Sequence, residues 1–446
     1  MHISSPVLTS TRHRRAIYLP LLAISLLLSP HLAAQSLEQA VAETLASNPE
    51  IKRAYNTFMG QNQASRAALG DYLPSVDIEA SAGYENYDNT TNSTGDYNPL
   101  DTTISLRQLI WDGSITYHNI QRTKAEAEAQ RYQLLADAQD KALRVAESYL
   151  SALEAQEVLV LSQKNYDIHQ RIFTDIKKRT DAGIGSIADL SQIEGRLARS
   201  RSNLIAAQNN LQDKNTEFLH IVGSPPVNLE KPEVDQNYLA NTLDTALNEA
   251  KANNPVLNVA KYDIDAATSQ YKQAKGDFLP TFSVEASQEW GDELDGTPGH
   301  TDEFKAMLKV EYNLYNGGTD LAESRQAAYQ LSESKDVRDR AYRLLEESTR
   351  LAWSGMELAI DQTQYLQEHV DASARTVIAY QKQFQIGQRT LLDVLNTENE
   401  LFEARKAYLQ SHYAGILAKY RVLNATGKLL DEMRVDVPDK WTTSVR

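Results

Sequence analysis

The chain has 446 residues, of which 24% are charged, and a formal net charge of −15. Its complete lack of cysteine excludes disulfides, thiolate metal sites, a cysteine nucleophile and a lipid-modified cysteine. The acidic balance argues against nucleic acid as a partner, because phosphates are neutralised by clustered lysine and arginine.

Residues 1–34 have the pattern of a secretory signal peptide. Basic residues at 12–15 precede an apolar run from Ala16 to Leu28, and Leu32-Ala33-Ala34 offers a cleavage site before Gln35. An uncleaved membrane anchor is the alternative, but the run is shorter than the roughly 20 residues that span a bilayer. No later segment approaches about 18 apolar residues, so the sequence predicts an exported chain without a transmembrane helix.

The remaining sequence is one unit that occurs twice. The landmarks of the first copy return in the same order and at a nearly constant offset, which indicates an internal repeat. They are Leu37 to Pro49, which returns as Leu243 to Pro255; Gly70 to Pro74, as Gly276 to Pro280; Trp111 to Gly113, as Tyr315 to Gly317; and Gly183, Asp189 and Gly223, as Gly387, Asp393 and Gly427. We therefore expect a first repeat over 35–223, a linker over 224–242, a second repeat over 243–427 and a C-terminal segment over 428–446.

Each copy is expected to begin with two helices and two strands. The predicted helices cover 36–47, 49–70, 243–253 and 256–276, and each pair is divided at an Asn-Pro step because proline disfavours helix in the residue before it. Apolar and polar residues then alternate, which is typical of strands with one apolar face. The predicted strands cover about 75–88, 102–111, 281–290 and 303–314.

Long helices follow the strands. After Gly113 and Gly318 the apolar residues recur every three or four positions, the pattern of a coiled-coil seam. We expect helices over 114–181 and 319–386, each roughly 100 Å long at 1.5 Å per residue, and returning helices over 187–222 and 390–427. The predicted fold is therefore mainly α with a membrane β part, built as two repeats of a long helix hairpin and two strands.

Four strands pose a problem if they face lipid. Strand edges cannot be left in a bilayer, and about eight strands form the smallest closed barrel, so several chains would have to share one barrel. A sheet packed on a protein core is the alternative, but the long helices leave no segment to form that core. In a barrel, the polar face would line a wet lumen with Glu79, Glu85, Lys305, Lys309 and Glu311. Aromatic residues near the strand ends would lie at the membrane interfaces, namely Tyr84, Tyr87, Trp111, Trp290 and Tyr312.

The two segments between the long helices and the returning helices carry a family resemblance. Phe384 to Asn396 and Gly183 to Leu190 resemble the periplasmic tip turns of TolC-family outer-membrane channels. An Asn-Pro after the first helix, Gly-Asp-x-Leu-Pro before a strand and Asp-Gly after one also match this family. The resemblance implies a homotrimer with a 12-stranded barrel in outer-membrane lipid, a helical periplasmic tunnel, and an equatorial layer from 224–242 and 428–446. It also implies a closed tip that an adaptor protein and an inner-membrane transporter open, so the channel needs no catalytic site or cofactor.

The resemblance assigns roles to residues of the tip. Arg389 matches an arginine that ties neighbouring hairpins together, and Asp189 matches an acidic partner of this kind. Asp393 matches the first of two aspartates that ring the constriction. The simpler interpretation is that all three are solvated polar residues at helix turns.

Other tip residues depart from the family pattern. Asn396 stands where the second aspartate is expected, Phe384 replaces a tyrosine and Ala188 replaces a threonine. These changes predict a looser gate. We expect the turns at Gly183, Gly185 and Gly387 to contact the adaptor.

Three functions remain open at this stage. The favoured one is the exit duct of type I protein secretion with an ABC-type transporter, because the chain has no cysteine for a lipid anchor. The second is the outer component of a multidrug efflux pump, which could be proton-driven, and the third is a periplasmic structural coiled coil. An enzyme is not expected, since the sequence has no His-Glu-x-x-His, Walker A or Gly-x-Ser-x-Gly motif. His300 near Asp295 and Asp302 is better explained by a polar loop than by a metal site.

Overall fold

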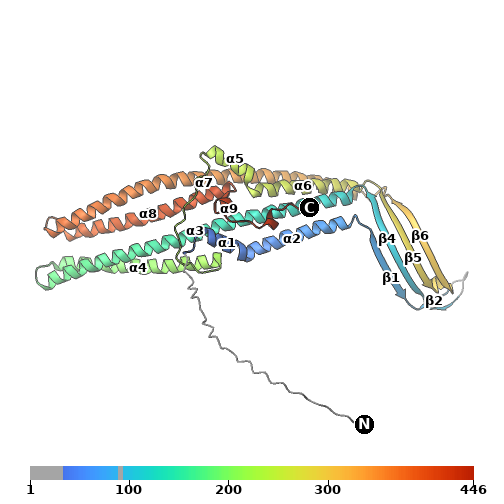
Figure 1. The fold of residues 1–446 in the computed structure, drawn as a ribbon, viewed down its shortest axis with the longest axis horizontal. Helices are drawn as coiled ribbons and strands as arrows, with labels where there is room; N and C mark the ends of the chain where they lie inside the picture. The colour runs from blue at the N-terminus through green and yellow to red at the C-terminus, as the bar shows by residue number, and fades with distance from the viewer. Residues whose placement is uncertain (1–33, 89–93, 446) are drawn as a thin grey trace, which may run out of the picture.

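The computed structural model describes residues 34–88 and 94–445. The expected signal peptide lies outside these residues, apart from Ala34. Figure 1 shows a long bundle of helices with a sheet at one end and two helix turns at the other. Among the helices of the described residues, none is both long enough and apolar enough to cross a membrane.

The first repeat contains four helices. They are α1 (Leu37–Ser47), α2 (Pro49–Gly70), α3 (Ile115–Asp181) and α4 (Ile187–Val222). Ser36 and Gln39 form a capping box at the start of α1. Asn48 caps α2, and Pro49 occupies the first helical position, where no backbone N–H is needed.

The second repeat has the same four helices in the same order. They are α5 (Leu243–Asn253), α6 (Pro255–Gly276), α7 (Thr319–Gln385) and α8 (Leu391–Ala425). The short helices α9 (Leu429–Glu432) and α10 (Asp439–Thr442) follow. The helix expected over 390–427 ends two residues early, because Gly427 adopts a positive φ of 73° that a right-handed helix cannot contain.

The strands form a four-stranded antiparallel sheet. Its order is β1 (Ser75–Ala82), β4 (Leu100–Asp112), β5 (Thr281–Asp292) and β6 (His300–Glu311). A separate hairpin consists of β2 (Glu85–Tyr87) and β3 (Gly95–Tyr97). The short 3₁₀ helix η1 (Leu294–Gly296) lies between β5 and β6.

Two strand expectations are corrected by this sheet. The strand expected over 75–88 is broken after Ala82, because Gly83 lies opposite Pro99, which has no N–H to continue the ladder. Glu85 therefore belongs to the small hairpin and not to the polar face of the main sheet. The strand expected over 303–314 ends at Glu311, since its partner β5 begins only after Pro280.

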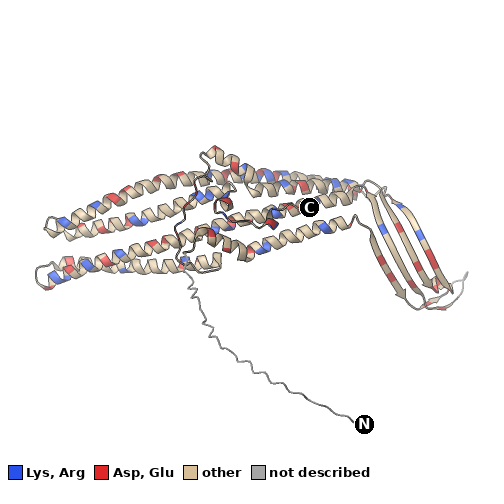
Figure 2. Ribbon diagram, in the orientation of Figure 1, with Lys and Arg blue, Asp and Glu red and all other residues tan. Residues whose placement is uncertain are grey.

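The register places apolar and polar residues on opposite faces of the sheet. One row across the strands contains Val76, Leu106, Ala286 and Ala306, and the next row contains Asp77, Ser105, Ser287 and Lys305. On the polar face, Glu285 lies 3.8 Å from Arg107 and 3.6 Å from Lys309. Figure 2 shows charged residues along these strands. The apolar face is uncovered in the described chain, with Ile78, Phe304 and Leu308 all about 70% exposed.

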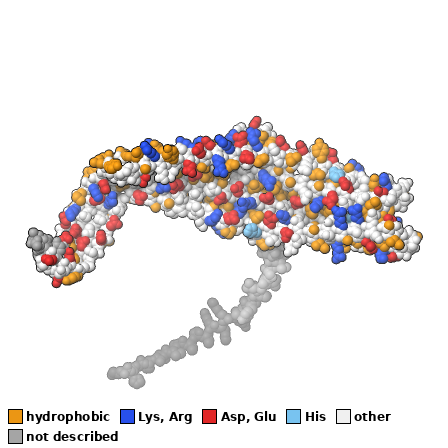
Figure 3. Space-filling model, turned by 180° about the vertical axis from the view of Figure 1, so that it is seen from behind, with side chains coloured by type: hydrophobic (Ala, Val, Ile, Leu, Met, Phe, Trp, Pro, Cys, Tyr) orange, Lys and Arg blue, Asp and Glu red, His pale blue; other side chains and the backbone are white. Residues whose placement is uncertain are grey.

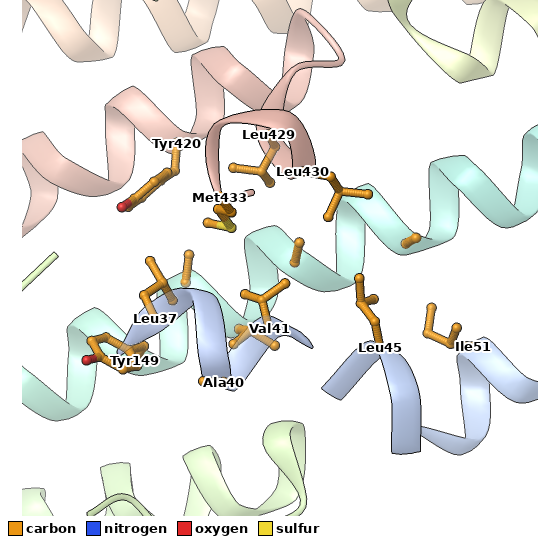
Figure 4. Close-up of a cluster of buried hydrophobic side chains, with 14 of the residues drawn as sticks. Leu37, Ala40, Val41, Leu45, Ile51, Tyr149, Tyr420, Leu429, Leu430 and Met433 are labelled. Carbon is orange, nitrogen blue, oxygen red and sulfur yellow. The ribbon is translucent and has the colours of Figure 1, made fainter. Parts of the chain in front are cut away.

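The largest core lies midway along the helices. Tyr149 of α3 and Tyr420 of α8 are fully buried, and Leu37, Val41, Leu429 and Met433 pack in the same cluster (Figure 4). Residues of the linker and of the C-terminal segment lie against this core, and the backbone N–H of Asp235 donates to Glu432 over 2.9 Å.

Candidate functional site

Two helix turns lie at the end of the molecule opposite the sheet (Figure 1). Residues 182–186 join α3 to α4, and residues 386–390 join α7 to α8. Gly183 and Gly387 each have a φ of 76°. The next residue of each turn, Ile184 or Gln388, donates its N–H back to the carbonyl five residues earlier, which closes the preceding helix. The two repeats therefore contain turns of the same kind at equivalent positions.

The two turns differ at the residue that follows the donor of this closing hydrogen bond. A Cβ atom on Gly185 would lie 2.6 Å from the backbone nitrogen of Thr180, so this turn cannot accept a side chain without moving. The corresponding residue of the second turn is Arg389. Only the second turn therefore presents a charged side chain at this place.

Arg389 makes all of its observed contacts inside its own hairpin. Its guanidinium carbon lies 4.3 Å from the ring centre of Tyr380, and its Nε donates to Gln383 over 3.1 Å. Its Nη1 lies 4.0 Å from the carboxylate of Asp393. Within the described part of one chain, no ion pair joins Arg389 to Asp189. The expected contact between these two residues remains a prediction for neighbouring chains.

The two aspartates stand at the starts of the returning helices. The backbone N–H of Asp189 lies 3.5 Å from the hydroxyl of Ser186, which caps α4. Asp393 accepts hydrogen bonds from the N–H and the hydroxyl of Thr390 at 3.2 and 2.9 Å, and returns one from its own N–H. This capping box, which the Thr-x-x-Asp spacing could have revealed, holds the pKa of Asp393 below its ordinary value.

Asn396 joins the two hairpins, which sequence reasoning did not anticipate. Its side-chain oxygen accepts a hydrogen bond of 2.8 Å from Nη2 of Arg196 on α4. Phe384 packs on a group of buried residues at the tip, and the guanidinium of Arg179 lies 5.9 Å from its ring centre. The residues that sequence reasoning missed are therefore Arg179 and Arg196, for which the local sequence gives no signal.

Buried titratable groups lie just behind the tip. Glu398 of α8 is buried, and Nε2 of Gln381 donates to it over 2.5 Å. Burial raises the pKa of Glu398 and lowers that of His169 on α3. The described residues contain no group of three or more histidine, aspartate or glutamate side chains that could hold a metal ion.

The surface has an apolar region and a charged region. Figure 3 shows hydrophobic side chains gathered where the helices meet the sheet, and charges of both signs spread over the helical part. Leu314 and Tyr315, at this junction, are more than 80% exposed. The tip also exposes apolar side chains, those of Ile184, Ile187 and Ile386.

Comparison with known proteins identifies relatives along most of the chain. BepC, an outer membrane efflux protein of Brucella suis biovar 1 (strain 1330), is 27% identical over 88% of this chain and 87% of its own length. The outer membrane protein TolC of Escherichia coli (strain K12) is 23% identical over 90% and 83%. The alkaline protease secretion protein AprF of Pseudomonas aeruginosa is 24% identical over 88% and 84%.

A solved structure has the same fold. The outer membrane protein VceC of Vibrio cholerae matches with a TM-score of 0.77 and 16% identity, covering 88% of this chain and 96% of VceC. The sequence model of the family described as "Outer membrane efflux protein" matches residues 40–224 and 246–428, which are the two repeats. The chain therefore belongs to the outer membrane efflux protein family and is a TolC-like outer-membrane channel protein with a periplasmic helical extension.

Proposed function

We propose that three copies of this chain form the outer-membrane exit duct of a tripartite export system. In this assembly, twelve strands close one barrel and the helices form one periplasmic tunnel. An adaptor and an inner-membrane transporter engage the tip and supply the energy. The channel then needs no catalytic site or cofactor of its own.

The sheet supports the shared barrel. Its outer strands β1 and β6 each have one edge without a partner strand in the described chain. Its apolar face is exposed, and a sheet with free edges cannot lie in lipid. Four strands from each of three chains would remove every edge and exceed the roughly eight strands that a barrel needs. The apolar face would then contact outer-membrane lipid, and the polar face would line the lumen.

The observation that carries the trimer is a stripe of exposed apolar residues on α7. They follow each other at intervals of seven residues and are between 52% and 68% exposed: Val337, Leu344, Leu351, Leu358 and Tyr365. We call this set the α7 stripe. A heptad interval places all of them on one face of a helix, which is the pattern that packs against another helix. On α4, Ile205 and Leu219 are also exposed and lie two heptads apart, so α4 of a second copy is a matching partner.

The tip residues take the roles that the family resemblance implies. Arg389 and Asp189 would join neighbouring chains, because both are accessible and neither pairs with the other within one chain. Such an exposed ion pair contributes little free energy, which suits a contact that must open. Asp393 would face the constriction. The turns at Gly183, Gly185 and Gly387 would contact the adaptor, supported by the exposed isoleucines beside them.

Within this function, we propose type I protein secretion with an ABC-type transporter. The lack of a cysteine for lipid attachment supports this assignment, as does the similarity to AprF, whose name records protease secretion. The similarity to BepC, named as an efflux protein, supports multidrug efflux as the second candidate. Loss of secreted proteins from the culture medium, without a change in drug susceptibility, after deletion of the gene would support secretion.

The trimer is tested by introducing a charge into the α7 stripe. Unboiled wild-type protein from the outer-membrane fraction should run on a detergent gel near three times the monomer mass. Leu351→Asp should run as a monomer, because the carboxylate would have to be buried between helices. Gln364→Asp, at an exposed position of α7 that points about 100° away from the stripe around the helix, is the matched control and should remain trimeric. A wild-type protein found as a soluble periplasmic monomer would overturn the proposal.

A further inference from the structure

The helices present two different faces where they meet the sheet. On one face a polar cavity lies between α3, α6 and α7, and Arg122, Asp277 and Glu323 are among its lining residues. On α3, Arg131 follows Arg122 by nine residues and therefore points about 180° away from it. Its Nη1 donates to the main-chain carbonyl of Trp441 over 3.4 Å, so the C-terminal segment lies on the face opposite the cavity.

Exposed apolar side chains lie on this opposite face at the helix ends. Tyr55 of α2 lines a groove against the C-terminal segment, and Leu69 follows it by about four turns, so both are on the same face. On α7, Leu321 precedes Glu323 of the cavity by two residues, which places it about 160° away. Leu69 is 52% exposed and Leu321 49%. Figure 3 shows hydrophobic side chains gathered at this junction, where the face continues the apolar face of the sheet.

A cation lies one turn farther from the sheet on two of these helices. Arg66 precedes Leu69 by three residues, and Arg325 follows Leu321 by four, intervals that place two side chains on one face of a helix. Both arginines are exposed. Along the helix axis, each lies about 5–6 Å farther from the sheet than its leucine. The order on both helices, going away from the sheet, is therefore an apolar side chain and then a cation.

A third cation stands at the end of α6. Lys275 follows Gln273, which lines the cavity, by two residues, so it also points toward the opposite face. Its Nζ lies 4.3 Å from the ring centre of Tyr271. Phe278 and Leu279, just after the helix, are 44% and 45% exposed. The name basic belt is used below for Arg66, Lys275 and Arg325.

The basic belt has no carboxylate partner in the described chain. Within residues 34–88 and 94–445, none of its three side chains forms an ion pair. The carboxylates of Asp277 and Glu323 lie on the cavity face instead. An unpaired cation beside an apolar surface matches the boundary of a lipid leaflet, where phosphate groups border the acyl chains.

We propose that the basic belt binds the headgroups of anionic phospholipids in the periplasmic leaflet of the outer membrane. The headgroup layer on each side of a bilayer is about 5–7 Å thick, which matches the step from the leucines to the arginines. Lysine and arginine close to such a surface attract acidic lipids. Three copies of the chain would place three such belts around the base of one barrel. This inference rests on the proposed channel function, because it needs the apolar face of the sheet to contact lipid.

Fluorescence quenching by brominated lipids tests this preference. All proteins carry Trp290→Phe, which leaves Trp111 as the tryptophan of the sheet, at the end where the basic belt lies. The purified trimer is inserted into vesicles of phosphatidylcholine and phosphatidylglycerol, with one of the two lipids brominated at a time. The extent of quenching then gives the binding constant of one lipid relative to the other.

Two triple variants are compared with the protein that keeps its belt. Arg66→Gln/Lys275→Gln/Arg325→Gln removes the belt. Lys164→Gln/Arg199→Gln/Arg375→Gln is the matched control, because it removes the same charge from exposed positions in the part of the helices far from the sheet. An unboiled detergent gel shows that each variant is still a trimer before it is added to vesicles.

At low salt, the protein with an intact belt should favour phosphatidylglycerol over phosphatidylcholine by about fivefold, the effect of roughly one cation near the membrane surface. The belt variant should bring this ratio close to one, the control should keep the preference, and high salt should weaken it. A ratio close to one for the intact belt in an inserted trimer, or an equal loss in the control, would overturn the inference and leave the channel function standing. If the intact protein does not enter vesicles, the proposed function fails, and this inference fails with it.

Discussion

The hydroxyl oxygen of Tyr149 lies 2.6 Å from the main-chain carbonyl oxygen of Gln35. The same hydroxyl is 2.7 Å from the carbonyl oxygen of Glu230, in the linker. The tyrosine is fully buried on α3 (Figure 4), and burial raises the pKa of its hydroxyl, which keeps the proton for donation. One side chain of the long helix thus holds the segment before α1 and the linker against the main core.

Removing this hydroxyl should weaken the middle of the molecule. Tyr149→Phe keeps the ring but removes the donor to the partly buried carbonyl of Glu230, which typically costs about 1–2 kcal/mol. The thermal midpoint of the detergent-solubilised protein should fall. Tyr329→Phe is the control, since Tyr329 is 78% exposed on α7 and should change the free energy of unfolding by less than about 0.5 kcal/mol. Equal midpoints for both variants would contradict the assigned role.

A buried ion pair anchors the C-terminal segment. Nε of Arg131 lies 2.8 Å from Glu128, and both side chains are less than 8% exposed. Glu128 also accepts the backbone N–H of Val445 over 2.6 Å. Glu128→Ala would leave a buried guanidinium without its partner, which typically costs about 3–5 kcal/mol.

This variant should release the C-terminal segment to proteases. Limited proteolysis followed by mass spectrometry should show faster cleavage within residues 434–445 than in the wild type. Glu126→Ala is the matched control on the same helix, because its pair with Arg122 is about one third exposed and contributes about 0–1 kcal/mol. Cleavage at the wild-type rate in Glu128→Ala would show that the pair does not anchor the segment.

Helices were predictable where capping signals are local. Asn48-Pro49 and Asn254-Pro255 end one helix and begin the next, and the structure has helix boundaries at both sites. The break after Ala82 was not predictable, because it depends on Pro99, which lies across the ladder and not beside it in sequence. Local chemistry determines a cap, whereas strand pairing determines where a strand ends.

At the tip, too, features set by local sequence were predictable and contacts between distant segments were not. The turns at Gly183 and Gly387 were predictable, since glycine readily adopts the positive φ that closes a helix. The contact from Arg196 to Asn396 was not, because it depends on which faces of α4 and α8 meet. The assignment of Asn396 to a constriction came from the family resemblance alone, and its observed partner belongs to the other hairpin.

The buried Glu398 predicts a pH dependence of stability. Burial raises its pKa above the ordinary value of 4.5 in the folded protein, while Gln381 and the charges of Arg405 and Arg171 oppose this rise. The folded state therefore binds the proton more tightly than the unfolded state. The stabilisation of the folded state that comes from this proton binding is fully present below pH 4.5 and is lost as the pH rises through the folded-state pKa.

Glu398→Gln should remove this dependence, since an amide does not titrate. The thermal midpoint of the variant minus that of the wild type should grow as the pH rises from 4 to 7. Both midpoints are measured at each pH in the same detergent. Glu403→Gln, on an exposed face of α8, is the control and should follow the wild-type pH profile. Parallel profiles for wild type and Glu398→Gln would exclude this carboxyl as the source of the dependence.

Replacing glycine by alanine should lower the thermal stability at the tip turn and raise it within helix α4. Gly387 has a φ of 76°, and a Cβ there would meet no atom within 4 Å, so Gly387→Ala costs only backbone strain of about 1 kcal/mol. Gly195 lies inside α4 and also has open space for a Cβ. Gly195→Ala should stabilise the helix by about 0.5–1 kcal/mol, because alanine loses less backbone entropy on folding. Since both sites are sterically open, thermal midpoints that shift in opposite directions would isolate the backbone conformation as the cause. A rise in both midpoints would show that the turn at Gly387 relaxes without strain.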